Sequence, residues 1–348
     1  MQTILLLIIS FSKIKINNKL YLGSELLMIR KLLVLLFYNV LISGLGAQQP
    51  TQYTMYMFNP LQYNPAVAGI NDKINVIGVI RQQWVGFEGN PSSQNLSVDL
   101  PINYLNSGIG LQLDNDQLGA GSYLQVGASY AQRINIKDDQ FVSVGIMAKF
   151  SQMKIDGAKL RTPEGNYTNA ILDHQDSYLT GSVMSGSALT NNIGIYYENR
   201  NINLGLGIVN ILPKKIPLGN NNYSLKSNYF FNLATNFQIN RIKLTPSLLY
   251  KTDLIQHQLD LSLISEWFNK YFIGFSNRGF NKNTFESVAI LAGINLNEKL
   301  KFCYSFDIGI SKLKSFNNGS HEIIVKYTLQ NNFGKGVLPK IIYNPRFL

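Results

Sequence analysis

The chain has 348 residues, and its 31 Lys and Arg residues against 20 Asp and Glu residues give a formal net charge of +11. Charged residues make up only 15% of the chain, against about 25% in average soluble proteins, whereas aromatic residues reach 11%. The mean hydropathy is near zero and no run past residue 47 approaches the roughly 20 apolar residues of a spanning helix, which argues against a bundle of transmembrane helices. The basic residues are scattered singly, so we expect no nucleic-acid partner.

Residues 1–47 are typical of an export signal. A short basic region, Met28–Lys31, precedes the apolar run 32–45 and a small-residue site, so we expect a signal peptide that is cleaved before Gln48. On this interpretation Met28 is the start and residues 1–27 are an over-extended N-terminus. A retained anchor helix is the alternative, but the apolar run is short for a span.

Residues 300–327 alternate between apolar and polar side chains. Because a strand points successive side chains to opposite faces, one face is apolar and the other polar. The apolar row contains Phe302, Tyr304, Phe306 and Ile308, and the polar row contains Lys301, Cys303, Ser305 and Asp307. The same pattern recurs along the chain without any segment that could cover the apolar faces. The fold class predicted is therefore all-β, a transmembrane outer-membrane β-barrel whose apolar faces meet lipid.

We expect about 14 antiparallel strands between residues 72 and 329, an even number, as closed single-chain barrels normally have. Within these bounds the polar residues 155–186 are interpreted as one long loop, and residues 330–348 as a C-terminal tail. The predicted strands are Ile74–Gln83, Ser92–Leu100, Ser107–Asp114, Ser122–Ile134, Gln140–Met153, Asn191–Glu198, Ile202–Val209, Asn228–Gln238, Ile242–Lys251, His257–Ser265, Lys270–Ser276, Glu286–Leu296, Lys299–Ile308 and Ser320–Leu329.

Residues 48–71 do not fit a strand. Two Asn-Pro steps, Asn59-Pro60 and Asn64-Pro65, would interrupt a regular ladder, and the aromatic residues around them need burial. We predict that this segment enters the lumen as a plug or packs on the periplasmic rim. A flexible mature N-terminus is the alternative, although a free coil would not usually hold so many aromatic side chains.

Several motifs together resemble those of a known family. They are Tyr56–Pro60, Asn64–Gly69, Arg81–Trp84, Gly86, Pro91, Gly108–Gly110, Gly274–Arg278, Tyr304–Asp307 and Gly319–Ile323. From about residue 49 to residue 329, the chain resembles the PorP/SprF family of type IX secretion system outer-membrane proteins of Bacteroidetes. Two features depart from the family pattern: Thr51–Tyr56 matches the opening aromatic-Gln-Tyr motif only loosely, and residues 335–348 continue past the last strand.

The resemblance implies a barrel of the bacterial outer membrane that is an accessory of type IX secretion. It implies support for the export or surface anchoring of a large adhesin used in gliding motility or adhesion. The implied partners are the secreted adhesin, periplasmic components of the secretion system and outer-membrane lipid. The residues in family motifs that we expect to face a partner or the lumen are Asn59, Pro60, Asn64, Pro65, Gly69, Arg81, Trp84, Arg278, Asp307, His321 and Glu322.

Charged residues of the polar rows are the candidates for specificity. An unpaired ion in a narrow lumen is costly, so we expect Arg81 and Arg278 to pair with carboxylates and to tie the plug or a loop to the wall. Asp99, Asp114, Asp260 and Asp307 lie on the polar parity. These residues either bind a partner segment or only fill the lumen, and the sequence favours the second.

No catalytic constellation is indicated. Ser320 and His321 are neighbours in a predicted strand and point to opposite faces, so they cannot act as nucleophile and base. His321-Glu322 lacks the second His of a helical zinc motif. We therefore expect no enzyme, catalytic residue, metal or cofactor.

Two other functions compete with secretion. A plugged channel for uptake of hydrophobic small molecules is possible, because a barrel of this size can enclose a plugged lumen. A soluble two-sheet β protein is disfavoured by the export signal and by the uncovered apolar faces.

Overall fold

The computed structural model describes residues 51–71, 73–137, 139–167, 173–176, 179, 181–219, 221–279, 286–310, 314–315 and 317–330. The predicted export signal, residues 1–47, and residues 331–348 of the predicted tail lie outside the described residues. Among the described residues no helix has the length and apolar character to cross a membrane.

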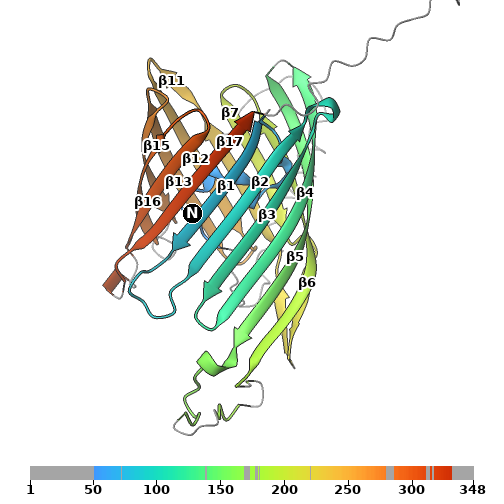
Figure 1. Ribbon diagram of the computed structural model, residues 1–348, viewed down its shortest axis with the longest axis vertical. Helices are drawn as coiled ribbons and strands as arrows, with labels where there is room; N and C mark the ends of the chain where they lie inside the picture. Colours follow the sequence, from blue (N-terminus) through green and yellow to red (C-terminus); the bar gives the residue numbers. More distant parts are fainter. Residues whose placement is uncertain are drawn as a thin grey trace, which may run out of the picture. The chain divides into compact units, whose positions relative to one another are not determined.

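Antiparallel strands form one closed barrel (Figure 1). The first strand, β1, pairs with the last strand, β17, and β10 pairs with both β7 and β12, which completes the ring. β10 and β11 are two parts of one strand, interrupted at Asn236, that both pair with β12, so the barrel has 14 strands. They are β1 (Lys73–Gln82), β2 (Ser92–Ile102), β3 (Ser107–Leu118), β4 (Gly121–Lys137), β5 (Gln140–Asp156), β6 (Val183–Glu198), β7 (Ile202–Val209), β10 (Asn228–Thr235), β11 (Phe237–Ile239), β12 (Ile242–Thr252), β13 (His257–Trp267), β14 (Tyr271–Arg278), β15 (Ser287–Asn295), β16 (Leu300–Gly309) and β17 (Ser320–Gln330).

Each predicted strand corresponds to one strand of the barrel, and the predicted closed all-β fold is confirmed. The largest difference concerns the predicted loop 155–186. β5 continues to Asp156 and β6 begins at Val183 rather than at Asn191, so both strands extend into the ends of that loop (Figure 1).

A two-stranded hairpin explains the longer strands. β8 (Lys214–Leu218) and β9 (Asn221–Leu225) lie in the connection between β7 and β10 and pair only with each other. Ile216 of this hairpin is fully buried against Tyr123, Met153 and Ala188 of β4, β5 and β6. The extended part of β5 and β6 therefore has apolar cover on one face, supplied by residues distant in sequence.

The two faces of the strands agree with the predicted alternation. On β16, the side chains of Phe302, Tyr304 and Ile308 are 36–40% exposed on the outer face, whereas Cys303 and Asp307 are buried. β4 and β7 repeat this pattern, with apolar side chains outside and small or polar ones inside. Exposed apolar side chains on nearly every strand form the continuous outer surface that a membrane barrel presents to lipid.

Residues 51–71, here called the inner segment, contact the inward face of the strands. Three short 3-10 turns, η2 (Tyr56–Phe58), η3 (Pro60–Gln62) and η4 (Pro65–Val67), break the segment at the two Asn-Pro steps, as predicted. Its apolar side chains form buried clusters with inward residues of β1, β5, β10 and β14, among others. The apolar core thus lies between the inner segment and the wall. Two further 3-10 turns are η5 (Asn103–Leu105) and η6 (Gly157–Lys159).

Replacing Ile290 by Arg tests the lipid-facing surface. Ile290 lies in the middle of β15 with 46% of its surface exposed. A charge at the bilayer midplane should lower the free energy of unfolding by about 2–4 kcal/mol. Urea unfolding of the barrel in lipid vesicles, followed by Trp fluorescence, measures this loss. Ile290→Leu is the control, and an equal stability of the two variants would contradict a lipid-facing β15.

Candidate functional site

Four buried charged side chains meet on the inward face of the barrel and are here called the charge cluster. They are Arg81 of β1, Arg278 of β14, Asp307 of β16 and Glu322 of β17. Nη2 of Arg81 lies 2.7 Å from Oδ2 of Asp307, and Nη1 of Arg81 lies 3.0 Å from Oε2 of Glu322. Nη1 of Arg278 lies 3.7 Å from the same Asp307 oxygen. The expected Arg–carboxylate pairing is therefore present, and the closed ring brings together residues from both ends of the chain.

The charge cluster binds the inner segment. The backbone N–H groups of Thr54 and Met55 donate to the Glu322 carboxylate, over 2.8 and 2.9 Å. The Thr54 hydroxyl donates to Asp307 over 2.7 Å and accepts from the guanidinium groups of the two arginines over 3.0 and 2.8 Å. One donated and two accepted bonds use the full capacity of a hydroxyl group. The charges thus tie this part of the inner segment to the wall, as the sequence led us to expect.

A second polar contact lies around Asn59. Its Nδ2 donates to Oδ1 of Asn95 over 2.7 Å and to Oγ of Ser97 over 3.1 Å, both on β2. Nδ2 of Asn95 in turn donates to Asp114, which forms a buried ion pair of 3.1 Å with Lys149. A chain of polar contacts therefore runs from the inner segment across β2 and β3 to β5.

The second Asn-Pro step lies in a glycine-lined recess. Asn64 caps η4 by accepting from the N–H of Ala66 over 3.0 Å, and its Nδ2 donates to the carbonyl of Ile195 over 3.1 Å. A Cβ atom on any of four inward glycines would overlap the backbone or side chains of residues 63–66. These glycines are Gly145, Gly194, Gly205 and Gly207. Their absent side chains let the inner segment approach the wall closely.

Gly69, the glycine of the inner segment, also lies close to the wall. Its φ of +63° is a left-handed conformation, and a Cβ there would lie 2.6 Å from both the Gly108 Cα and the Leu100 carbonyl oxygen. Only glycine fits such a turn against the wall without strain. Gly108, Gly205 and Gly207 therefore lie where the lumen is crowded by the inner segment.

The remaining candidate residues are two prolines of the inner segment, Trp84 and His321. Pro60 and Pro65 occupy the first positions of η3 and η4. Trp84 is half-buried in the connection between β1 and β2, where its N–H donates to Oγ of Ser320 over 3.1 Å. His321 points outward, because its neighbour Glu322 points inward, and its Nδ1 lies 2.7 Å from the Tyr304 hydroxyl. His321 therefore does not line the lumen.

Burial also affects two phenols of the inner segment. Burial raises the pKa of Tyr56 to about 12, and the pKa of Tyr63 is raised further for the same reason. Both phenols therefore stay protonated at neutral pH. The Tyr56 hydroxyl donates to the Asp260 carbonyl over 3.4 Å, and the Tyr63 hydroxyl donates to the Tyr56 carbonyl over 3.4 Å. These phenols act as hydrogen-bond donors that hold the segment in place.

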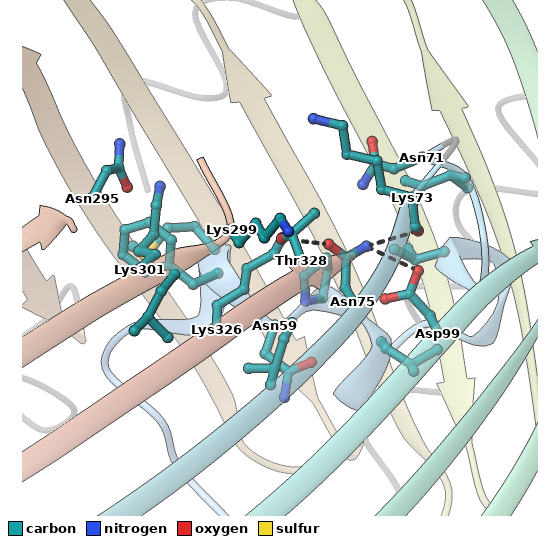
Figure 2. A pocket seen from close by; sticks show the side chains of 18 of the residues that line it. Asn59, Asn71, Lys73, Asn75, Asp99, Asn295, Lys299, Lys301, Lys326 and Thr328 are labelled. Carbon is teal, nitrogen blue, oxygen red and sulfur yellow. Dashed lines mark hydrogen bonds between the residues drawn. The ribbon is translucent and has the colours of Figure 1, made fainter. Parts of the chain in front are cut away.

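A cavity of about 1010 Å³ lies beside the inner segment, at the end of the barrel with the short turns (Figure 2). Residues of the turns β13–β14 and β15–β16 line it, together with the end of β6, the start of β7, the start of β1 and the end of β17. Its charged lining residues are Lys73, Asp99, Glu198, Lys270, Glu298, Lys299, Lys301 and Lys326. In the part of the chain that the structure describes, no group of three or more His, Cys, Asp or Glu side chains is arranged to hold a metal.

Sequence reasoning missed Thr54 and Asn95, and it missed the lysines of the cavity. Thr54 acts through its backbone N–H as well as its hydroxyl, which residue type does not reveal. Asn95 lies on the inward parity of β2 beside Ser97, and this alternation of small polar side chains was the available signal.

Comparison with known proteins supports the resemblance. Residues 45–327 match the model of a family described as type IX secretion system membrane protein PorP/SprF. No curated protein matches the chain. The match confirms the expected family, and together with the closed barrel it confirms the expected location in the outer membrane.

Several solved structures are weakly similar to this chain. The Ralstonia pickettii toluene transporter TbuX has a TM-score of 0.47 and 10% identity, over 80% of this chain and 94% of that chain. The monoaromatic hydrocarbon channel CymD has a TM-score of 0.47 and 9% identity, over 84% and 96%. A Pseudomonas aeruginosa FadL homologue has a TM-score of 0.43 and 10% identity, over 82% and 95%. Similarities this low say nothing about a shared substrate.

Asp307→Asn should loosen the inner segment. The variant leaves Arg278 without a carboxylate partner, and breaking a buried pair costs about 3–5 kcal/mol of the free energy of unfolding. Cys303, the single cysteine, is buried in one cluster with Tyr53 and Met55, so its thiol should react faster with a maleimide. Urea unfolding and the rate of labelling measure the two effects.

Asp139→Asn is the matched control for Asp307→Asn. Asp139 forms an ion pair of 2.7 Å with Arg200 in which both side chains are mostly exposed, so its loss should cost about 1 kcal/mol or less. Equal losses in the two variants, with unchanged labelling of Cys303, would show that the charge cluster does not hold the segment.

Gly194→Ala should also destabilise the protein. Its new Cβ would overlap the Asn64 side chain, and overpacking typically costs about 1–3 kcal/mol. Gly78→Ala is the control, because nothing lies within 4 Å of a Cβ at Gly78 of β1. Thermal unfolding monitored by circular dichroism compares the two. A Gly194→Ala variant as stable as Gly78→Ala would contradict the close contact.

Proposed function

Because this chain belongs to the PorP/SprF family of type IX secretion system membrane proteins, we propose that it supports export or surface anchoring of a large adhesin. In this proposal the barrel is an accessory of the secretion system and acts through protein–protein contacts. The adhesin serves gliding motility or adhesion.

The filled lumen is the observation that carries the proposal. The inner segment is bonded to the wall at Thr54, Asn59 and Asn64, through strands on different sides of the barrel. A channel through this lumen would require the segment to leave these contacts, including buried charge-assisted hydrogen bonds. A barrel with a filled lumen is better suited to present surfaces to other proteins than to pass a solute.

The lengths of the connections support an orientation. In outer-membrane barrels the periplasmic turns are short and the extracellular loops longer. The turns β4–β5, β6–β7 and β15–β16 are short, whereas 157–182 and 210–227 connect strands at the opposite end. We therefore assign the cavity to the periplasmic side, where components of the secretion system would bind. The long connections are assigned to the cell surface, where the adhesin would be held.

Deletion of the gene followed by surface proteomics tests the proposal. We expect one large adhesin to disappear from the surface and to return when the wild-type chain or the Asp139→Asn control is expressed. If the surface proteins remain and the cells instead lose uptake of a hydrophobic compound, the secretion proposal is wrong and the channel alternative holds.

A further inference from the structure

The cavity differs from the rest of the lumen in the pairing of its cations. Elsewhere in the lumen, Arg81, Lys149 and Lys251 each lie within 4.0 Å of a carboxylate oxygen. The lysines that line the cavity are Lys73, Lys270, Lys299, Lys301 and Lys326. Within the described residues, none of these five lysines forms an ion pair.

Two of these lysines face each other directly. Lys301 of β16 and Lys326 of β17 are cross-strand partners, and both line the cavity (Figure 2). Like charges in directly opposite positions destabilise a sheet. Lys301 lies over the rings of Phe58 and Phe272, 5.3 and 5.0 Å from their centroids, which offsets only part of this repulsion. This local arrangement opposes stability, and such arrangements are expected at functional sites.

The carboxylates of the cavity do not balance the lysines. Among the residues that the structure describes, three acidic side chains, those of Asp99, Glu198 and Glu298, line the cavity with the five lysines. Asp99 accepts from Nδ2 of Asn75 over 3.2 Å, and Thr328 donates to Oδ1 of the same Asn75 (Figure 2). The cavity therefore keeps an excess of positive charge, which an anionic occupant would neutralise.

The inner segment gives the cavity an apolar floor. Its side chains Met57, Phe58, Leu61, Val67 and Ile70 line the cavity together with the lysines of the wall. The volume of about 1010 Å³ lies at the upper end of the range for ligand pockets, about 300–1,000 Å³. A site with an apolar floor and a cationic rim fits an extended ligand that carries both carboxylates and apolar side chains.

We propose that this cavity binds an acidic peptide segment of a periplasmic protein, whose carboxylates contact Lys301, Lys326 and the surrounding lysines while its apolar side chains pack on the inner segment. The assignment of that protein to the secretion system rests on the proposed function. The binding chemistry rests on the cavity alone.

A labelled peptide of alternating Glu and Leu residues is the probe. It should bind the full-length barrel purified in neutral detergent, and binding should weaken as salt is raised, because salt screens the contacts at the rim. The double variant Lys301→Gln, Lys326→Gln should weaken binding by about tenfold or more. Lys215→Gln is the matched control, since Lys215 is exposed on β8 and does not line the cavity.

Stability separates lost binding from misfolding. Because the double variant removes a like-charge pair, its unfolding temperature should equal or exceed that of the wild type. A Glu-Leu peptide that does not bind, or that binds the double variant as well as the wild type, overturns the proposal. So does equal binding of a Gln-Leu peptide, which would reveal an apolar site only. Equal competition by dodecanoate or by inorganic phosphate would reassign the cavity to a small anion.

The cellular experiment keeps the two proposals apart. If the peptide binds as expected but cells that carry the double variant still display the adhesin, the peptide site stands and its use in adhesin display is wrong. If the peptide does not bind but deletion removes the adhesin, the proposed function stands without this site.

Discussion

The hydrogen bonds between the charge cluster and Thr54 and Met55 are the constraint on which the rest of the lumen depends. Glu322 and Asp307 are buried carboxylates in a membrane barrel, and such groups are costly unless they are paired with cations and hydrogen-bond donors. Part of their partnership comes from arginines of the wall, and part from backbone N–H groups of the inner segment. The wall and the segment therefore need each other: without the segment the carboxylates lose donors, and without the wall the segment has no regular ladder to satisfy its own backbone.

The Asn-Pro motifs and the strand glycines form one structural feature. The proline at the first position of η3 and of η4 has no N–H to satisfy, and Asn64 caps η4, the turn that follows it. The chain around η4 can lie against the wall because the four facing wall residues are glycines and leave room for it. The Asn-Pro motifs and the strand glycines, although distant along the chain, thus form the two surfaces of a single contact. The same reasoning explains why Gly69 and Gly108, which belong to different motifs, face each other.

Much of this fold could be predicted from the period of two in the sequence, because lipid outside and a polar lumen inside impose that period on every strand. The full length of β5 and β6 could not, since their apolar cover is the β8–β9 hairpin, which comes later in the chain. The sequence also could not predict which arginine pairs with which carboxylate in the charge cluster. Arg81 and Asp307 are 226 residues apart, and only closure of the ring brings them together. His321 shows the opposite case, where alternation alone should have placed it outside the lumen once Glu322 was assigned to the inside.

The inner segment divides the lumen into two parts that differ in how their cations are paired. Toward the long connections Lys149 and Lys251 are paired with carboxylates, and a pocket of about 70 Å³ lies beside them. Toward the short turns the lysines of the cavity form no ion pair with any described residue, and a large cavity remains. The inner segment contacts both parts of the lumen. Thr54 is hydrogen-bonded to the charge cluster, whereas Phe58 and Ile70 line the cavity. The cavity therefore exists only while the segment is bound to the wall, so the buried charges determine the shape of a site that they do not touch.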